Sequence, residues 1–123
     1  MNRLTSRQRT SLGNAWATEN GAFRAARRAG DHASAWRHLE RAHIISQPLA
    51  ARHVRTHLTM LRVALANADV REAVGQLFRV VVAGPGSLTG RYPAGNTGGT
   101  NVGAFRPMQI PGDLRPILGS EAP

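Results

Sequence analysis

Imidazole and carboxylate side chains recur at helical spacing in the middle of the chain. Glu40 and His43 are three residues apart in one segment, and His53 and His57 are four residues apart in the next. Both spacings place the two side chains on one side of a helix. Because an unpaired charge is costly to bury, a shared cation is the simplest explanation for such groups on apolar helix faces.

A fifth side chain, Glu19, lies on the apolar face expected for the preceding helix. If the chain turns near residues 30 and 48, hairpin geometry brings position 43 opposite 53, position 40 opposite 57, and position 19 level with about 42. We therefore predict a mononuclear metal site made by Glu19, Glu40, His43, His53 and His57. These donors suit divalent Zn, Ni, Co, Fe or Mn. Only one Glu-x-x-His is present, whereas di-iron bundles use two, which disfavours a two-metal centre.

Each of these residues also has an explanation that needs no metal. Glu40 could form a buried ion pair with Arg52 or Arg55, and His43 could be a core histidine with its hydrogen bonds satisfied. The histidine pair could be a solvated surface pair. The placement of all five in one layer favours the metal site over these separate explanations.

Four helices are expected to position these groups, near residues 8–29, 32–46, 48–67 and 70–83, with Pro48 at the first position of the third. A weak repeat supports two helical hairpins: residues 26–31 recur in similar form at 64–69, and Asp31 and Asp69 would each cap the next helix. The spacing is similar to that of tetratricopeptide units. We predict an all-α, compact bundle of about four helices.

The remaining third of the chain has another composition. Residues 84–123 hold nine glycines and six prolines, which neither a helix nor a central strand tolerates. We therefore divide the chain into a helical bundle (1–83) and an irregular C-terminal extension of the same domain (84–123). The extension is expected to pack over the bundle, because true linkers carry fewer spaced apolar residues. The residues expected to lie over the bundle are Leu88, Tyr92, Val102, Phe105, Met108 and Ile110.

Composition narrows the function classes. A chain of 123 residues is one domain at most, and the absence of cysteine excludes thiolate sites and thiol redox chemistry. All sixteen basic residues are arginine, and the net charge of +9 would suit an acidic protein partner. Their even spread makes nucleic acid a less favoured partner. No apolar stretch approaches membrane-spanning length and the N-terminus lacks a signal peptide pattern, so we expect a cytoplasmic protein.

Two motifs resemble the signature of a small bacterial family of unknown function. One is the run from Ala35 to Gln47, which contains Leu39-Glu40-Arg41-Ala42-His43; the other is Gly90-Arg91-Tyr92-Pro93-Ala94-Gly95-Asn96-Thr97-Gly98 with the following Phe105 to Pro111. Ser46 stands where the family pattern suggests glycine. Members of that family often lie in gene clusters for metal or arsenic resistance. The resemblance implies a metal-linked role, and the five predicted ligands match the family's histidine and glutamate pattern.

The sequence thus leads to a metal-binding protein, with a role in binding, storage or sensing. Two alternatives remain open. If one coordination position is free, the protein could be a metal-dependent hydrolase or oxygenase. If no metal binds, the arginine-rich helical hairpins could dock an acidic protein or nucleic acid.

Overall fold

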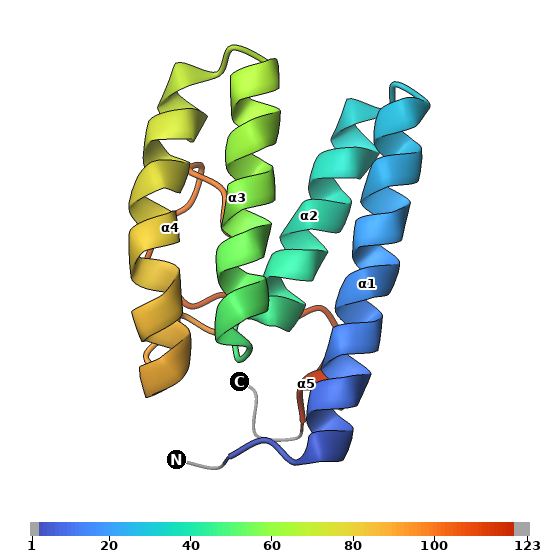
Figure 1. Ribbon diagram of the computed structural model, residues 1–123, viewed down its shortest axis with the longest axis vertical. Coiled ribbons are helices and arrows are strands. Elements are labelled where there is room, and N and C mark those ends of the chain that lie inside the picture. The colour runs from blue at the N-terminus through green and yellow to red at the C-terminus, as the bar shows by residue number, and fades with distance from the viewer. Residues whose placement is uncertain (1–2, 120–123) are drawn as a thin grey trace.

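The computed structural model describes residues 3–119. It contains four long helices, α1 (Ser6–Arg28), α2 (His32–Ser46), α3 (Ala50–Ala66) and α4 (Val70–Thr89), and one short turn of helix, α5 (Arg115–Leu118). No strand occurs among these residues. The predicted all-helical bundle with two hairpins is confirmed, and Figure 1 shows α1 with α2 and α3 with α4 as two antiparallel pairs side by side. None of the described helices is long and apolar enough to cross a membrane.

The helix starts follow local capping chemistry. Thr5 accepts a hydrogen bond from the Gln8 backbone while the Gln8 side chain accepts one from Thr5, which is a capping box. Asp31 and Asp69 cap α2 and α4 by accepting from the backbone N–H groups of Ser34 and Glu72. The two aspartates of the sequence repeat therefore have the predicted role.

Two predicted helix limits are wrong. Helix α3 starts at Ala50, so Pro48 lies in the turn before it and not at its first position. Helix α4 does not end at residue 83 but continues through Pro85 to Thr89. Gly84, which has no Cβ, relieves the usual clash of a residue that precedes proline. The helix ends where Gly90 adopts a left-handed conformation (φ 71°).

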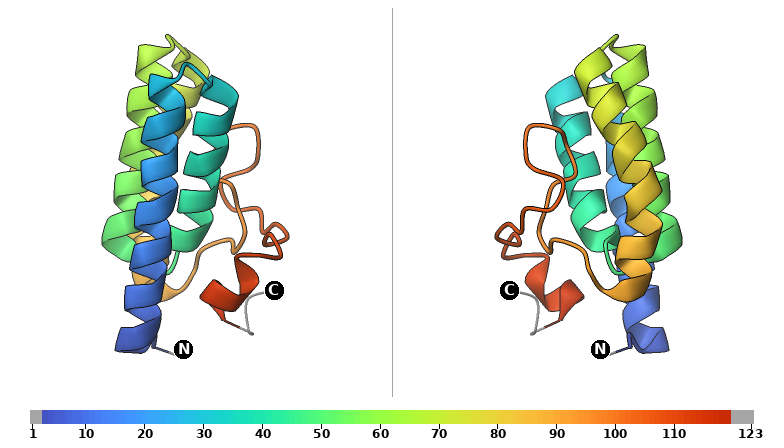
Figure 2. Two further views of the ribbon diagram at one scale, coloured as in Figure 1. Left: turned by 90° about the vertical axis from the view of Figure 1, so that its right-hand side faces the viewer. Right: turned by 90° about the vertical axis from the view of Figure 1, so that its left-hand side faces the viewer.

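The C-terminal segment after α4 packs along one face of the helices, and Figure 2 shows it beside α2. Its Ile110 and Leu114 are buried in a core with apolar residues of α1 and α2. A second core, made by Phe23, Ala35, Leu39 and Met60, joins the two hairpins. The ordered cover is therefore confirmed. Two of its expected anchors, Leu88 and Phe105, are instead exposed.

Candidate metal centre

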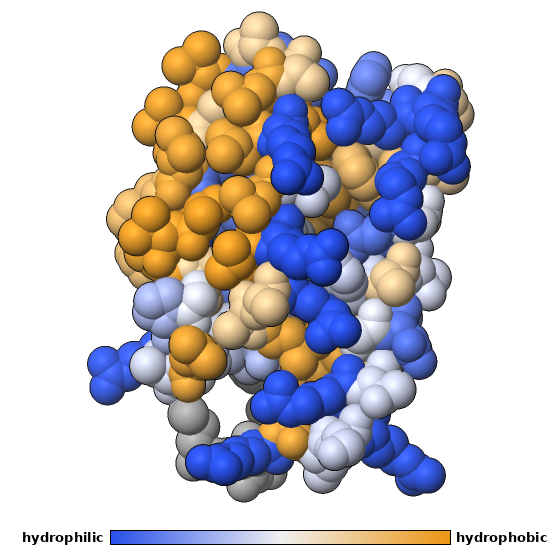
Figure 3. Space-filling view, viewed as in Figure 1, coloured by the Kyte–Doolittle hydropathy of each residue, from blue (hydrophilic) through white to orange (hydrophobic). Residues whose placement is uncertain are grey.

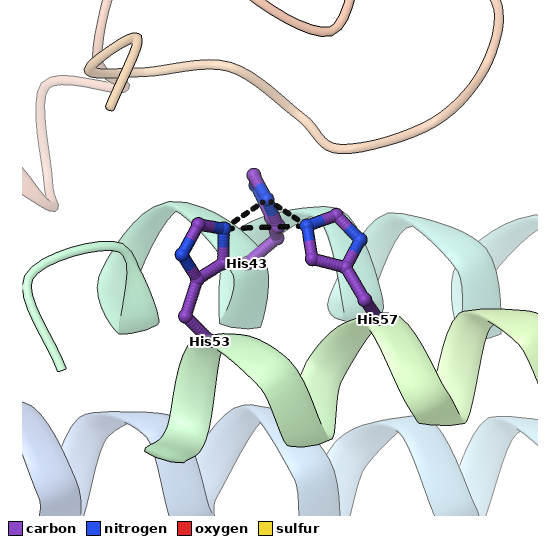
Figure 4. Close-up of side chains that lie close together, drawn as sticks. All are labelled: His43, His53 and His57. Carbon is purple, nitrogen blue, oxygen red and sulfur yellow. Dashed lines mark hydrogen bonds between the residues drawn. The ribbon is translucent and has the colours of Figure 1, made fainter. Parts of the chain in front are cut away.

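Three histidines from two helices converge on one point. His43 lies in the last turn of α2, and His53 and His57 lie one turn apart on α3. All three are buried, with at most 5% of each residue exposed. The Nε2 atom of His43 lies 2.9 Å from that of His57 and 3.0 Å from that of His53, and the third side of the triangle is 3.2 Å. Figure 4 shows the three rings directing these nitrogens at one another.

The turn between α2 and α3 produces this convergence. Pro48 and Leu49 reverse the chain within a few residues, so the end of α2 meets the first two turns of α3. Thr56 connects the helices around the triad: its hydroxyl donates within α3 to the Arg52 carbonyl and accepts from the Trp16 indole of α1. Met60, one turn beyond His57, is fully buried and packs with Phe23, Ala35 and Leu39.

The outward-facing nitrogens show which tautomer each histidine adopts, beginning with His43 and His53. The Nδ1 atom of His43 is 2.6 Å from the backbone oxygen of Asn96, which only accepts, so this Nδ1 carries the proton. The Nδ1 atom of His53 is 2.7 Å from the Ser87 hydroxyl. That hydroxyl uses its one proton to donate to the Gln47 carbonyl, so it accepts from His53.

His57 is held in the same tautomer by Gln76. The Gln76 amide nitrogen donates to the Gly98 carbonyl, which turns its Oε1 atom toward His57 Nδ1 at 2.7 Å. All three rings therefore donate through Nδ1, and all three Nε2 atoms present a bare lone pair to the same point. Metal-bound histidines have this arrangement, in which the distal N–H donates to an outer acceptor and fixes the ring.

Burial keeps the three imidazoles neutral. Desolvation lowers the pKa of His43 well below 6.5, and the neighbouring histidines lower it further. Desolvation also lowers the pKa of His53 to about 3, with the Ala83 carbonyl acting in the opposite direction. The pKa of His57 falls to about 4 for the same main reason, opposed by the Gln76 side chain. Neutral imidazole is the form that binds metal ions.

The C-terminal segment builds the outer layer of the site. Gln47 donates to the Pro93 carbonyl and accepts from the Gly95 N–H, which ties α2 to this segment. Gly98 adopts φ 88°, and a Cβ atom there would lie 2.7 Å from the His43 ring. Glycine is thus required both for the backbone conformation and for the close approach. The Gly95–Gly98 motif holds the acceptor of His43 and the carbonyl that orients Gln76.

A small cavity of about 30 Å³ adjoins the triad. Within residues 3–119, its walls include all three histidines and two arginines, Arg79 and Arg91, and no aspartate or glutamate. The volume corresponds to about one water molecule. The three protein donors therefore leave one side of the site open to an additional small ligand.

The two predicted glutamates lie apart from this group, which contains histidines alone. The Glu19 carboxylate bonds His38 Nδ1 at 2.7 Å and Arg41 Nε at 2.8 Å, so it pairs with basic side chains of α2. Glu40 is half-buried, and burial raises its pKa, opposed by Thr97 and Arg37. His38, predicted to lie at the surface, has 34% of its side chain exposed.

Sequence reasoning missed the residues that fix the tautomers. Gln76 and Ser87 both lie on α4, whose predicted end at residue 83 left Ser87 in the irregular segment. Asn96 acts through its backbone carbonyl, which no residue type reveals. The Gly95–Gly98 motif was the available signal, because glycines at fixed positions indicate backbone that must approach another group closely.

Comparison with known proteins identifies the family to which the chain belongs. A family model described as a protein of unknown function (DUF3703) matches residues 10–118. The chain belongs to the DUF3703 family. The match includes α1 from residue 10 onward, the whole of α2, α3 and α4, and the segment that packs over them, so the triad and its outer acceptors lie within the family domain. No curated protein and no solved structure matches the chain.

Proposed function

We propose that this protein binds one divalent transition-metal ion between the Nε2 atoms of His43, His53 and His57, in a role of metal binding, storage or sensing. The observation that carries the proposal is the convergence of three unprotonated nitrogens within 3.2 Å of one another. With each Nδ1 proton committed outward, no hydrogen bond can form between the three Nε2 atoms. Three lone pairs held together in a buried site repel one another unless a cation lies between them.

The separations suit a first-row ion. Donors at 2.0–2.1 Å from a tetrahedral zinc ion lie about 3.3–3.4 Å apart, and donors on one face of an octahedral ion lie about 2.9–3.0 Å apart. The observed 2.9–3.2 Å lies between these geometries, so a small relaxation accommodates either. Three imidazoles without thiolate or carboxylate favour borderline ions such as Zn, Ni, Co, Fe and Mn over hard ions such as Ca²⁺.

The open side of the triad suits reversible binding. Structural zinc sites are closed by four protein ligands, whereas three ligands with a free position let the ion exchange its remaining ligands. The cavity of about 30 Å³ beside the histidines provides that position. The same feature keeps metal-dependent hydrolysis as a second candidate, because an ion with an open position can activate water.

Elemental analysis tests the proposal. Protein prepared without an affinity tag is loaded with Zn, Ni, Co, Mn or anaerobic Fe(II), separated from free metal and analysed. We expect one ion per chain in the wild type, and loss of the ion in His53→Asn and in His57→Asn. Glu40→Gln and His38→Gln are the matched controls and should retain the ion. Zinc at about 100 times its Kd should also stabilise the wild type by about 2.7 kcal/mol.

Two results would contradict the proposal. One is a wild-type protein that takes up none of these ions and shows no thermal stabilisation by them. The other is an ion that stays bound at one equivalent after both histidine substitutions, because that ion would have other ligands. Circular dichroism of each variant separates loss of the metal from loss of the fold.

A further inference from the structure

The charges around the triad indicate which kind of ligand would occupy the free coordination position of the metal ion. This inference rests on the proposed function. None of the three histidines contributes negative charge, because each is a neutral donor. Among the residues that the structure describes, the cavity wall carries Arg79 and Arg91 and no carboxylate. A divalent ion there would add two positive charges to a site that already has two guanidinium groups nearby.

Arg79 places part of this excess positive charge inside the protein and not only at its surface. It is 8% exposed, and its Nη atoms donate to the backbone carbonyls of Gly75, Gly99 and Val102. These acceptors orient the guanidinium but carry no charge that neutralises it. The carboxylate of Glu72 acts on Arg79 electrostatically, and its hydrogen bond is made with the Thr100 N–H. The same segment holds Asn96 against His43, so the cation and the triad are fixed by one stretch of chain.

We infer that the open position binds a small anion, held by the ion and by Arg79 and Arg91. A cavity of about 30 Å³ accepts a ligand of the size of hydroxide, or one end of a linear or planar monoanion. Tyr92 and Phe105 form part of the rim and limit the size of the ligand. Azide is therefore a suitable probe, and sulfate, which is larger, should be excluded.

The test uses the Co(II) form of the full chain, because the visible spectrum of cobalt reports its ligands. Azide and sulfate are titrated at constant ionic strength into wild type, Arg91→Gln, Arg79→Gln and the control Arg62→Gln. Arg62 is exposed on α3 and outside the cavity wall, so its variant matches the change in net charge. We expect azide to change the wild-type spectrum and sulfate to leave it unchanged.

The variants should separate local from long-range charge effects. We expect the azide Kd to rise about two- to fivefold in Arg91→Gln, about tenfold or more in Arg79→Gln, and little in Arg62→Gln. If Arg79→Gln fails to fold, the test rests on comparing the azide Kd of Arg91→Gln with that of Arg62→Gln. A cobalt site that ignores azide, or equal weakening in all three variants, would overturn the inference but leave the metal site intact. Failure to bind cobalt would overturn the proposed function and this inference together.

The outer face of α4 carries exposed apolar side chains. Val70, Val74, Leu77 and Val81 are each more than half exposed, and Leu88 is 73% exposed. These residues are spaced alternately by four and three positions, and the alternation continues through position 84 to Leu88. This is the spacing of a coiled-coil seam. The opposite stripe of α4, with Ala73, Gln76, Arg79 and Ala83, faces the inside of the protein. Figure 3 shows the resulting apolar surface over α3 and α4.

The sequence repeat indicates what kind of element fits this seam. Shifted by the thirty-eight residues of the repeat, Trp36, Leu39 and His43 of α2 correspond to Val74, Leu77 and Val81 of α4. Leu39 and His43 are buried, and α3 packs beside them through Met60 and the histidine pair. On α4 the corresponding positions are exposed, and the one described helix that follows, α5, packs against α1 instead. The seam thus has the form of a surface that receives one more helix.

Charge favours a second copy as the source of that helix. Between Arg71 and Arg91 the chain carries two charged residues: Glu72, whose carboxylate accepts from the Thr100 N–H, and Arg79, which is buried. An acidic partner would find no cation on the seam to pair with, whereas two copies would meet without like charges at the centre. The exposed area of Phe78, Leu65 and the seam residues is roughly 800 Å² per copy, similar to the area of about 800 Å² that each partner buries in a stable interface.

We propose that the chain forms a homodimer through the seam of Val70, Val74, Leu77, Val81 and Leu88. Sedimentation equilibrium tests this on wild type, the double variant Leu77→Glu/Val81→Glu and the control Ala17→Glu, whose site is exposed on α1. Both substituted seam positions are exposed, so the fold should be unaffected. We expect a dimer for wild type and control and a monomer for the seam variant.

Salt separates a second copy from a charged partner. With a net charge of +9 per chain, self-association should tighten as salt screens the repulsion between copies. Binding of an acidic protein or nucleic acid would weaken with salt. A wild-type chain that is monomeric at high salt, or a seam variant that remains dimeric, would overturn the proposal. If the seam variant loses its circular dichroism signal, the single variant Val74→Lys provides the decision.

Discussion

Acid should destabilise the metal-free protein, and the triad defines the direction and pH range of the effect. Burial lowers the pKa of His53 to about 3 and that of His57 to about 4, and lowers that of His43 well below 6.5. In the unfolded chain each imidazole regains its ordinary pKa near 6.5. Between about pH 4 and 6.5 the unfolded state therefore binds more protons than the native state, so the free energy of unfolding decreases as the pH falls.

The magnitude follows from the number of groups. Each histidine that is neutral when folded and protonated when unfolded changes the free energy of unfolding by about 1.4 kcal/mol per pH unit. For the three histidines of the triad, the slope reaches up to about 4 kcal/mol per unit near pH 5. Domains of this size have a stability of about 5–15 kcal/mol, so the metal-free protein should unfold within about two to three units below neutral pH.

Urea unfolding of the metal-free chain, in half-unit steps from about pH 7 to about pH 4.5, measures this slope. His53→Leu should reduce the slope by about one third, because it removes one of three buried titrating groups. The control His32→Gln changes a histidine whose residue is exposed at the start of α2 and should leave the slope unchanged. A stability that is constant or increases as the pH falls from 6.5 would refute the description of the triad as buried and neutral.

Three further substitutions test the roles given to Gln76, Glu19 and Gly98. Gln76→Leu removes the acceptor of His57 Nδ1 and should weaken metal binding by about 10–100-fold, whereas Gln76→Glu keeps an acceptor and should retain it; equal affinities in a metal titration would contradict the role given to Gln76. Glu19→Gln breaks the ion pair that joins α1 to α2 and should lower the free energy of unfolding by about 1–3 kcal/mol. One bound ion per chain should remain, and its loss would place Glu19 at the metal. Gly98→Ala meets both a left-handed backbone and the His43 ring, so we expect a loss of about 1–3 kcal/mol in stability together with weaker metal binding; calorimetry without change in either quantity would be inconsistent with the close packing at Gly98.

The fold was largely predictable because its signals are local. Asp31 and Asp69 cap helices as their positions in the repeat suggest, and helical periodicity located α1 to α4. The end of α4 was not predictable from composition, because Gly84-Pro85-Gly86 is typical of a helix boundary. Tertiary contacts override that preference: Ser87 in the last turn donates to the Gln47 carbonyl and accepts from His53.

Five ligands were predicted from the sequence, and the structure brings three of them, the histidines, together. The position of a residue in a hairpin determines its height along the helix axis. It does not determine the direction of the side chain around that axis closely enough to separate neighbouring positions. His43 therefore meets both His53 and His57, whereas Glu40 lies outside the group. Glu19 instead pairs with Arg41, which also bonds Asp113 far along the chain. No local pattern could reveal that long-range pairing.

The most direct test of the proposed metal centre is a crystal structure of the zinc-loaded protein with anomalous diffraction at the zinc edge. We expect one anomalous peak at about 2.0–2.1 Å from the Nε2 atoms of His43, His53 and His57, with a non-protein ligand on the side of the small cavity. A peak ligated by Glu19 or Glu40, or an empty triad in crystals that hold zinc elsewhere, would contradict it.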